Sequence, residues 1–86
     1  MDKVVLQSLA SDLKRITLSI QRNSASSTAR FNQEAANWLR EALEKTEDNN
    51  IKNLLEKVRS VLEQKDDLKK AEDCLMYSTL LQNRSL

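Results

Sequence analysis

The sequence contains no glycine, no proline and no histidine, and it contains a single cysteine. Tight β-hairpin turns and bulges depend on glycine for positive φ angles, and many loops depend on proline, so this composition argues against a β-rich or α/β fold. Without glycine the chain also lacks the glycine-rich loops that bind nucleotide phosphates. We therefore expect an all-α protein.

The absence of histidine removes the commonest general base and the commonest metal ligand together. Ser-His and Cys-His dyads and the usual catalytic zinc sites cannot be assembled from these residues. Most acidic residues are predicted to cap helices or to face solvent, apart from Glu34 and Glu72, which border apolar stripes. We expect no enzymatic activity, no metal and no cofactor.

Charge and cysteine content narrow the class of protein further. The net charge is +1, from 14 basic and 13 acidic residues, which is far from the strong positive balance of proteins held on nucleic acid by phosphate contacts. One cysteine forms no internal disulfide, so nothing indicates an oxidising compartment. The first residues lack the pattern of a signal peptide, and no apolar run approaches the roughly 20 residues that span a bilayer. We expect a cytoplasmic protein with no membrane association, for which nucleic acid is not the favoured partner.

Apolar residues recur at helical spacing in four stretches, and they predict one helical domain over residues 1–86 with helices at about 2–22, 28–46, 49–64 and 67–82. The polar segments NSASST, EDNN and KDD separate them and predict loops. Asp2 is a candidate cap for the first helix, Asp48 or Asn49 for the third, and Asp66 or Asp67 for the fourth. Short connections favour antiparallel neighbours, so we expect a small antiparallel four-helix (up-down) bundle that dimerisation could complete.

Two single residues have a structural and a functional interpretation. Trp38 lies on the apolar stripe of the second helix, which predicts a core anchor with its indole N–H at the rim; stacking on a ligand is the alternative. Cys74 borders the apolar face of the fourth helix, which predicts a buried structural thiol, because no basic environment favours a reactive one.

The fourth helix differs from the others because it is apolar on several sides. A helix of this kind is surrounded, either by its own chain or by a second one. Chains this short bury limited apolar surface, so further burial would stabilise the fold. We therefore predict a homodimer, with another protein as the alternative partner, and expect Leu18 or Leu43 as rim contacts. The predicted interface consists of Leu68, Leu75, Met76, Tyr77, Leu80 and Leu81.

Basic residues gather at one end of the predicted bundle, where the second and fourth helices begin. Helix N-termini favour anions, so this end could bind an acidic partner or a phosphate group unless Asp66, Asp67 and solvent neutralise it. The candidate anion-binding residues are Arg22, Arg30, Lys65, Lys69 and Lys70. The favoured function is that of a non-catalytic helical interaction protein; the alternative is a small binding module for nucleic acid or another anionic partner.

Overall fold

The computed structural model describes residues 3–84, and within this range it contains four helices and no strand. They are α1 (Lys3–Gln21), α2 (Ala25–Lys45), α3 (Asn49–Leu62) and α4 (Asp67–Arg84). The prediction of an all-α helical bundle is confirmed. The predicted cap at Asp2 lies outside the described residues.

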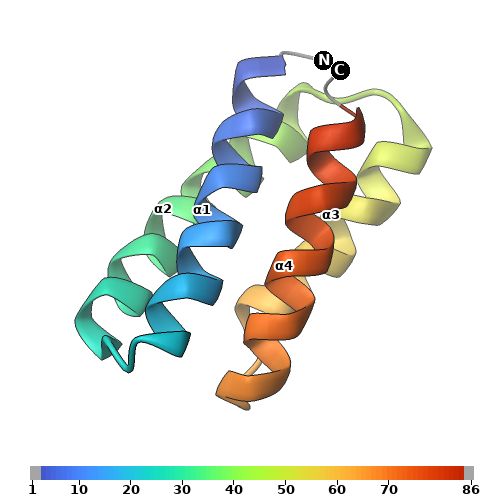
Figure 1. Cartoon of the computed structure of the whole chain (residues 1–86). Coiled ribbons are helices and arrows are strands. Elements are labelled where there is room, and N and C mark those ends of the chain that lie inside the picture. Colours follow the sequence, from blue (N-terminus) through green and yellow to red (C-terminus); the bar gives the residue numbers. More distant parts are fainter. Residues whose placement is uncertain (1–2, 85–86) are drawn as a thin grey trace.

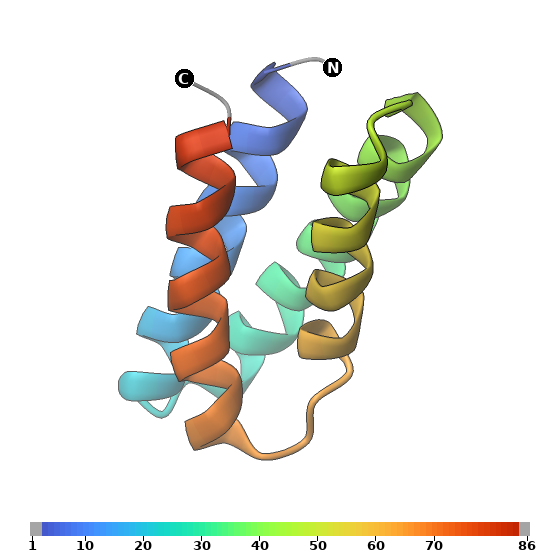
Figure 2. The same ribbon diagram turned by 90° about the vertical axis from the view of Figure 1, so that its right-hand side faces the viewer.

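The helices form a ring in which α1 contacts α2 and α4, and α3 contacts the same two helices. Figures 1 and 2 show that the chain turns back at each connection, so that the first turn of α1 and the last turn of α4 lie at the same end. The Cα atoms extend over 36 × 20 × 18 Å. Because packed helix axes lie about 8–10 Å apart, this cross-section corresponds to two helices by two.

The core is centred on α1, whose Leu9, Leu13 and Ile16 have no exposed surface. These side chains recur at spacings of three and four residues, so they share one face of the helix. Burying a large aliphatic side chain stabilises a fold by about 1.5–3 kcal/mol. The other helices contribute the buried residues Ala35, Leu39, Ala42, Leu55, Val58, Val61, Leu62, Ala71, Cys74 and Leu81.

Two hydroxyl groups join α1 to α4 across the core. Thr17 Oγ1 donates to the carbonyl oxygen of Ala71 at 2.8 Å, and Ser78 Oγ donates to the carbonyl oxygen of Ala10 at 2.7 Å. Side chains this short reach a carbonyl of the neighbouring helix only where the two backbones approach closely. Ala10 precedes Thr17 in α1, but its partner Ser78 follows Ala71 in α4, so these two helices run in opposite directions.

The connection between α1 and α2 is shorter than the sequence indicated. NSASST was expected to be a loop, but α2 already begins at Ala25. Asn23 adopts a left-handed conformation with φ of 56°. Its N–H donates to Ile20 O at 3.0 Å, and the N–H of Ser24 donates to Ser19 O at 2.9 Å. This is the Schellman arrangement that ends many helices; asparagine tolerates left-handed φ, so it occupies the position in a chain without glycine.

Aspartate caps begin the third and fourth helices, and in each case one of the two predicted candidates is used. Asp48 Oδ1 accepts hydrogen bonds from the backbone N–H groups of Asn50 at 2.8 Å and Ile51 at 3.4 Å. Asp66 Oδ1 accepts one from the N–H of Lys69 at 3.3 Å. These bonds satisfy N–H groups that have no partner inside the helix.

Asn23 provides a test of this turn. Asn23→Ala should lower the free energy of unfolding by about 1 kcal/mol, because a Cβ-bearing residue without asparagine's local hydrogen bonding is strained at left-handed φ. Asn23→Gly should leave it unchanged or raise it slightly. Urea denaturation of both variants is the measurement, and equal stability of the two would contradict the left-handed turn.

Candidate functional site

Four large apolar side chains of α4 point away from the core. Leu68 is 72% exposed, Leu75 and Met76 are each 48% exposed, and Leu80 is 40% exposed. At about 100° per residue they span about 140° of the helix surface. We call this set of residues the α4 outer face. It contains four of the six predicted interface residues.

The other two predicted interface residues lie elsewhere. Leu81 has no exposed surface, so it is a core residue and the prediction that it forms part of the interface needs correction. Its spacing of seven residues from Cys74 places both on the buried side of α4. Tyr77 is half-buried and packs against the core, as does Leu43. Leu18 is 38% exposed on α1 and remains available as a rim contact.

The predicted basic end contains four exposed basic side chains, Arg22, Arg30, Lys65 and Lys69. Figure 1 shows that the α1–α2 turn and the α3–α4 connection lie at the same end of the bundle. Arg30 lies 3.9 Å from Glu34 and over the ring of Phe31, at 5.0 Å from its centroid. Arg30 therefore lies along α2, next to Glu34 and over Phe31.

Lys70 is not available at the basic end, which corrects its prediction as an anion ligand. The residue is buried, and Nζ donates to the carbonyl oxygen of Leu62 at 2.9 Å. This bond satisfies a carbonyl at the C-terminus of α3, where a cation is also favoured by the helix dipole. Burial lowers the pKa of Lys70, and the Cys74 and Asp67 side chains partly oppose that shift.

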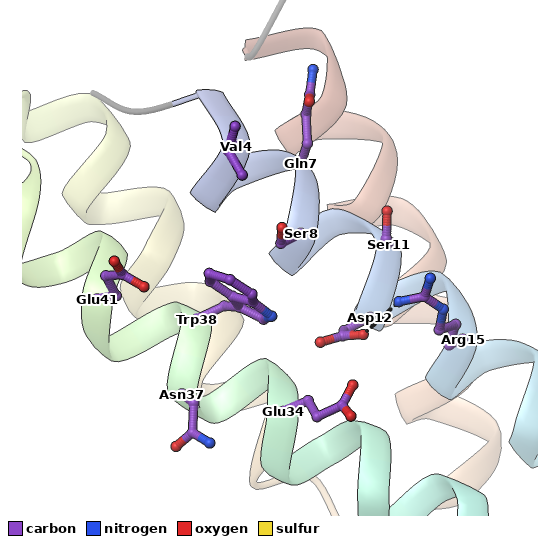
Figure 3. A pocket seen from close by; sticks show the side chains of 10 residues that line it. All are labelled: Val4, Gln7, Ser8, Ser11, Asp12, Arg15, Glu34, Asn37, Trp38 and Glu41. Atoms are coloured by element: carbon purple, nitrogen blue, oxygen red, sulfur yellow. Dashed lines mark hydrogen bonds and ion pairs between the residues drawn. The ribbon is translucent and has the colours of Figure 1, made fainter.

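An open groove of about 670 Å³ runs along the surface where α1 meets α2. Figure 3 shows Asp12 and Arg15 entering it from α1, and Glu34, Trp38 and Glu41 entering it from α2. The three α2 residues follow one another at spacings of four and three, so they share one face of the helix. The charged side chains lining the groove are three carboxylates and one guanidinium, so the groove is acidic.

Asp12 is the least expected residue of this groove because it is a carboxylate with only 1% of its surface exposed. Its Oδ1 accepts a hydrogen bond from Arg15 Nη1 at 2.8 Å. Its Oδ2 is buried and has no hydrogen-bond partner among residues 3–84. Burial raises the pKa of Asp12, and the hydrogen bond and charge of Arg15 oppose this shift. The like charge of Glu34 adds to the increase, as does the hydrogen bond that a protonated Asp12 makes to Glu34, so Oδ2 lacks a partner while both carboxyl groups are ionised.

The sequence interpretation missed Asp12, although a signal was present. The residue follows Leu9 by three positions and precedes Ile16 by four, which is the spacing of the buried stripe. Trp38 packs against the core as expected. In Figure 3 its indole nitrogen points along the groove toward Asp12. The groove therefore combines a buried carboxylate with a partly open aromatic ring.

Cys74 is fully buried, as the spacing predicted, and burial raises the pKa of its thiol to about 11. Within residues 3–84, no three His, Cys, Asp or Glu side chains are grouped to hold a metal ion. Over the same residues, none of the helices combines the length and apolar character needed to cross a bilayer. Comparison with models of known protein families, with curated proteins and with solved structures gives no match.

Replacing Lys70 tests its role at the C-terminus of α3. Lys70→Met keeps most of the aliphatic packing but leaves the Leu62 carbonyl without its donor. We expect the free energy of unfolding to fall by about 1–2 kcal/mol. The matched variant Lys69→Met, at the exposed neighbouring position, should change it by less than about 0.5 kcal/mol. Equal effects in urea denaturation would contradict the structural role of Lys70.

Replacing Asp12 should stabilise the protein in a pH-dependent way. The folded-state pKa is raised above the usual 3.8, so the ionised carboxylate destabilises the fold at neutral pH, and this effect disappears as the pH falls below 3.8. Asp12→Asn can donate a hydrogen bond toward Glu34 and should raise the free energy of unfolding at pH 7 by about 1 kcal/mol.

The control for this measurement is Glu44→Gln, which removes the same charge at an exposed position of α2. Thermal unfolding at pH 7 and at about pH 3 compares both variants with the parent chain. A stabilisation by Asp12→Asn that persists unchanged at the lower pH would contradict the assignment to the ionised carboxylate.

Proposed function

We propose that this chain is a non-catalytic helical interaction protein that forms a homodimer through the α4 outer face. The exposure of Leu68, Leu75, Met76 and Leu80 on one side of a single helix is the observation that carries the proposal. Contiguous exposed apolar side chains of this size are typical of interaction surfaces.

The charges on the same side of α4 favour a second copy as the partner. Lys69 and Glu72 are both exposed there, so the face has no net charge and two copies do not repel each other. In a two-fold dimer the same patch serves both subunits. If the two α4 helices pack antiparallel about a two-fold axis near Leu75 and Met76, Leu75 of one copy lies opposite Met76 of the second copy. The two helix dipoles then point in opposite directions, which is favourable.

The size of the chain supports the same proposal. A domain of 86 residues buries a smaller fraction of its surface than a larger domain does. Each large apolar side chain that becomes fully buried contributes about 1.5–3 kcal/mol, so the α4 outer face offers substantial stabilisation on association. Cys74 is free and buried, which fits a reducing compartment, and we propose that the protein acts in the cytoplasm.

The test is molar mass by light scattering over a wide concentration range, with thermal unfolding at each concentration. The parent chain should dimerise, and its melting temperature should rise with concentration. The double variant Leu75→Glu/Met76→Glu should raise the dissociation constant at least about tenfold, because charged groups would be desolvated at the centre of the interface.

The matched control, Asn53→Glu/Ser60→Glu, adds the same charge to exposed positions of α3 and should dimerise like the parent chain. A parent chain that remains monomeric at every concentration would refute the homodimer. Equal weakening by the two double variants would show that net charge, and not the α4 outer face, controls association.

A further inference from the structure

We propose that the groove between α1 and α2 binds a linear polyamine, an aliphatic chain with an ammonium group at each end. The groove has two anionic positions, one formed by Asp12 with Glu34 and the other by Glu41, and Trp38 lies between them (Figure 3). No part of this surface belongs to the α4 outer face, so the proposal is independent of the homodimer.

The unpartnered oxygen of Asp12 is the observation that points to a ligand. A buried carboxylate oxygen without a donor destabilises the fold, and here a second carboxylate, Glu34, faces it from α2. Arg15 satisfies only Oδ1, and its guanidinium carbon lies 5.8 Å from the ring centroid of Phe31. An ammonium group carries three donors, so it can satisfy Oδ2 and Glu34 together.

Glu34 lies on α2, across the groove from Asp12 (Figure 3). The Glu34 side chain is 45% exposed, and its ion pair with Arg30 is 3.9 Å long. A contact this long and this exposed contributes little to stability. An ammonium group of the ligand can therefore replace Arg30 at the Glu34 carboxylate without breaking a strong contact.

Glu41 provides the second anionic position, seven residues beyond Glu34 on the same helix. Seven residues of α-helix span about 10 Å, which sets the separation of the two ammonium groups. Glu41 now accepts a hydrogen bond from Lys45 Nζ at 2.6 Å, but the two side chains are 39% and 48% exposed. Exposed pairs of this kind are weak, so a ligand ammonium can replace Lys45.

Trp38 provides an apolar surface for the methylene groups of the ligand. Its ring lies between the anionic positions, where methylene groups can pack on its face and a nearby cation is attracted by its π electrons (Figure 3). An extended peptide with two lysines would instead press backbone amides against the indole ring, which desolvates them. The arrangement therefore favours a polyamine over a basic peptide.

Fluorescence of Trp38 offers a direct readout, since it is the single tryptophan of the chain. Titration with spermidine, whose terminal ammonium groups lie about as far apart as the two anionic positions, should give saturable binding of one ligand per chain. Putrescine, a shorter diamine with one ammonium group fewer, should bind at least about tenfold more weakly, because it reaches only one position and carries less charge. Calorimetry under the same conditions measures the stoichiometry.

Variants assign the binding to this groove. Asp12→Asn should weaken spermidine binding about tenfold, because one anionic ligand of the ammonium group is lost. The variant should also melt at a higher temperature at pH 7, so unfolding cannot explain the loss. Glu41→Gln should reduce the preference for spermidine over putrescine. The matched control Glu44→Gln removes the same charge from an exposed position outside the groove and should bind like the parent chain.

Three outcomes would overturn the proposal. The first is the absence of saturable spermidine binding to the parent chain. The second is an equal loss of affinity in Glu44→Gln and Asp12→Asn, which would indicate non-specific attraction to the net charge. The third is tighter binding of a peptide with two lysines three residues apart than of spermidine under the same conditions.

Discussion

The close approach of α1 and α4 is the constraint on which the rest of the structure depends. Thr17 and Ser78 each donate a hydrogen bond to a backbone carbonyl of the opposite helix, and small residues such as Ala10 and Ala71 lie where the helices meet. Small side chains let two helix backbones come together, and the hydroxyl bonds set their register. Both α2 and α3 complete the bundle around this core, α2 against α1 and α3 against α2 and α4.

This choice of small residues has a consequence for the surface of α4. Because Ala71, Cys74 and Ser78 occupy the buried side, large residues such as Leu75 and Met76 are left outside. Larger side chains at positions 71, 74 and 78 would have kept α1 farther away. The close packing of α4 on α1 therefore leaves its large apolar side chains on the outside, and these side chains form the proposed dimer interface.

The groove between α1 and α2 is acidic, whereas the α4 outer face is apolar. There the chain keeps a buried carboxylate, Asp12, whose Oδ2 has no partner within the described part of the chain, and a second carboxylate, Glu34, faces it. Proteins commonly retain such locally unfavourable groups where a ligand is bound, since binding needs an interaction left open in the free state.

Composition and apolar spacing were enough to predict the four helices and to include the two capping aspartates among the candidates, because these depend on residues close together in the sequence. They favoured a buried Cys74 without deciding it. Asp12 has the spacing of the buried stripe of α1, but carboxylates usually face solvent, so its burial was missed. Spacing was not enough to show that Leu81 is buried or that Lys70 caps α3. A helix apolar on several sides has no unique inward face. Only contact with the neighbouring helices selects one, because the side chains then compete for a limited interior volume.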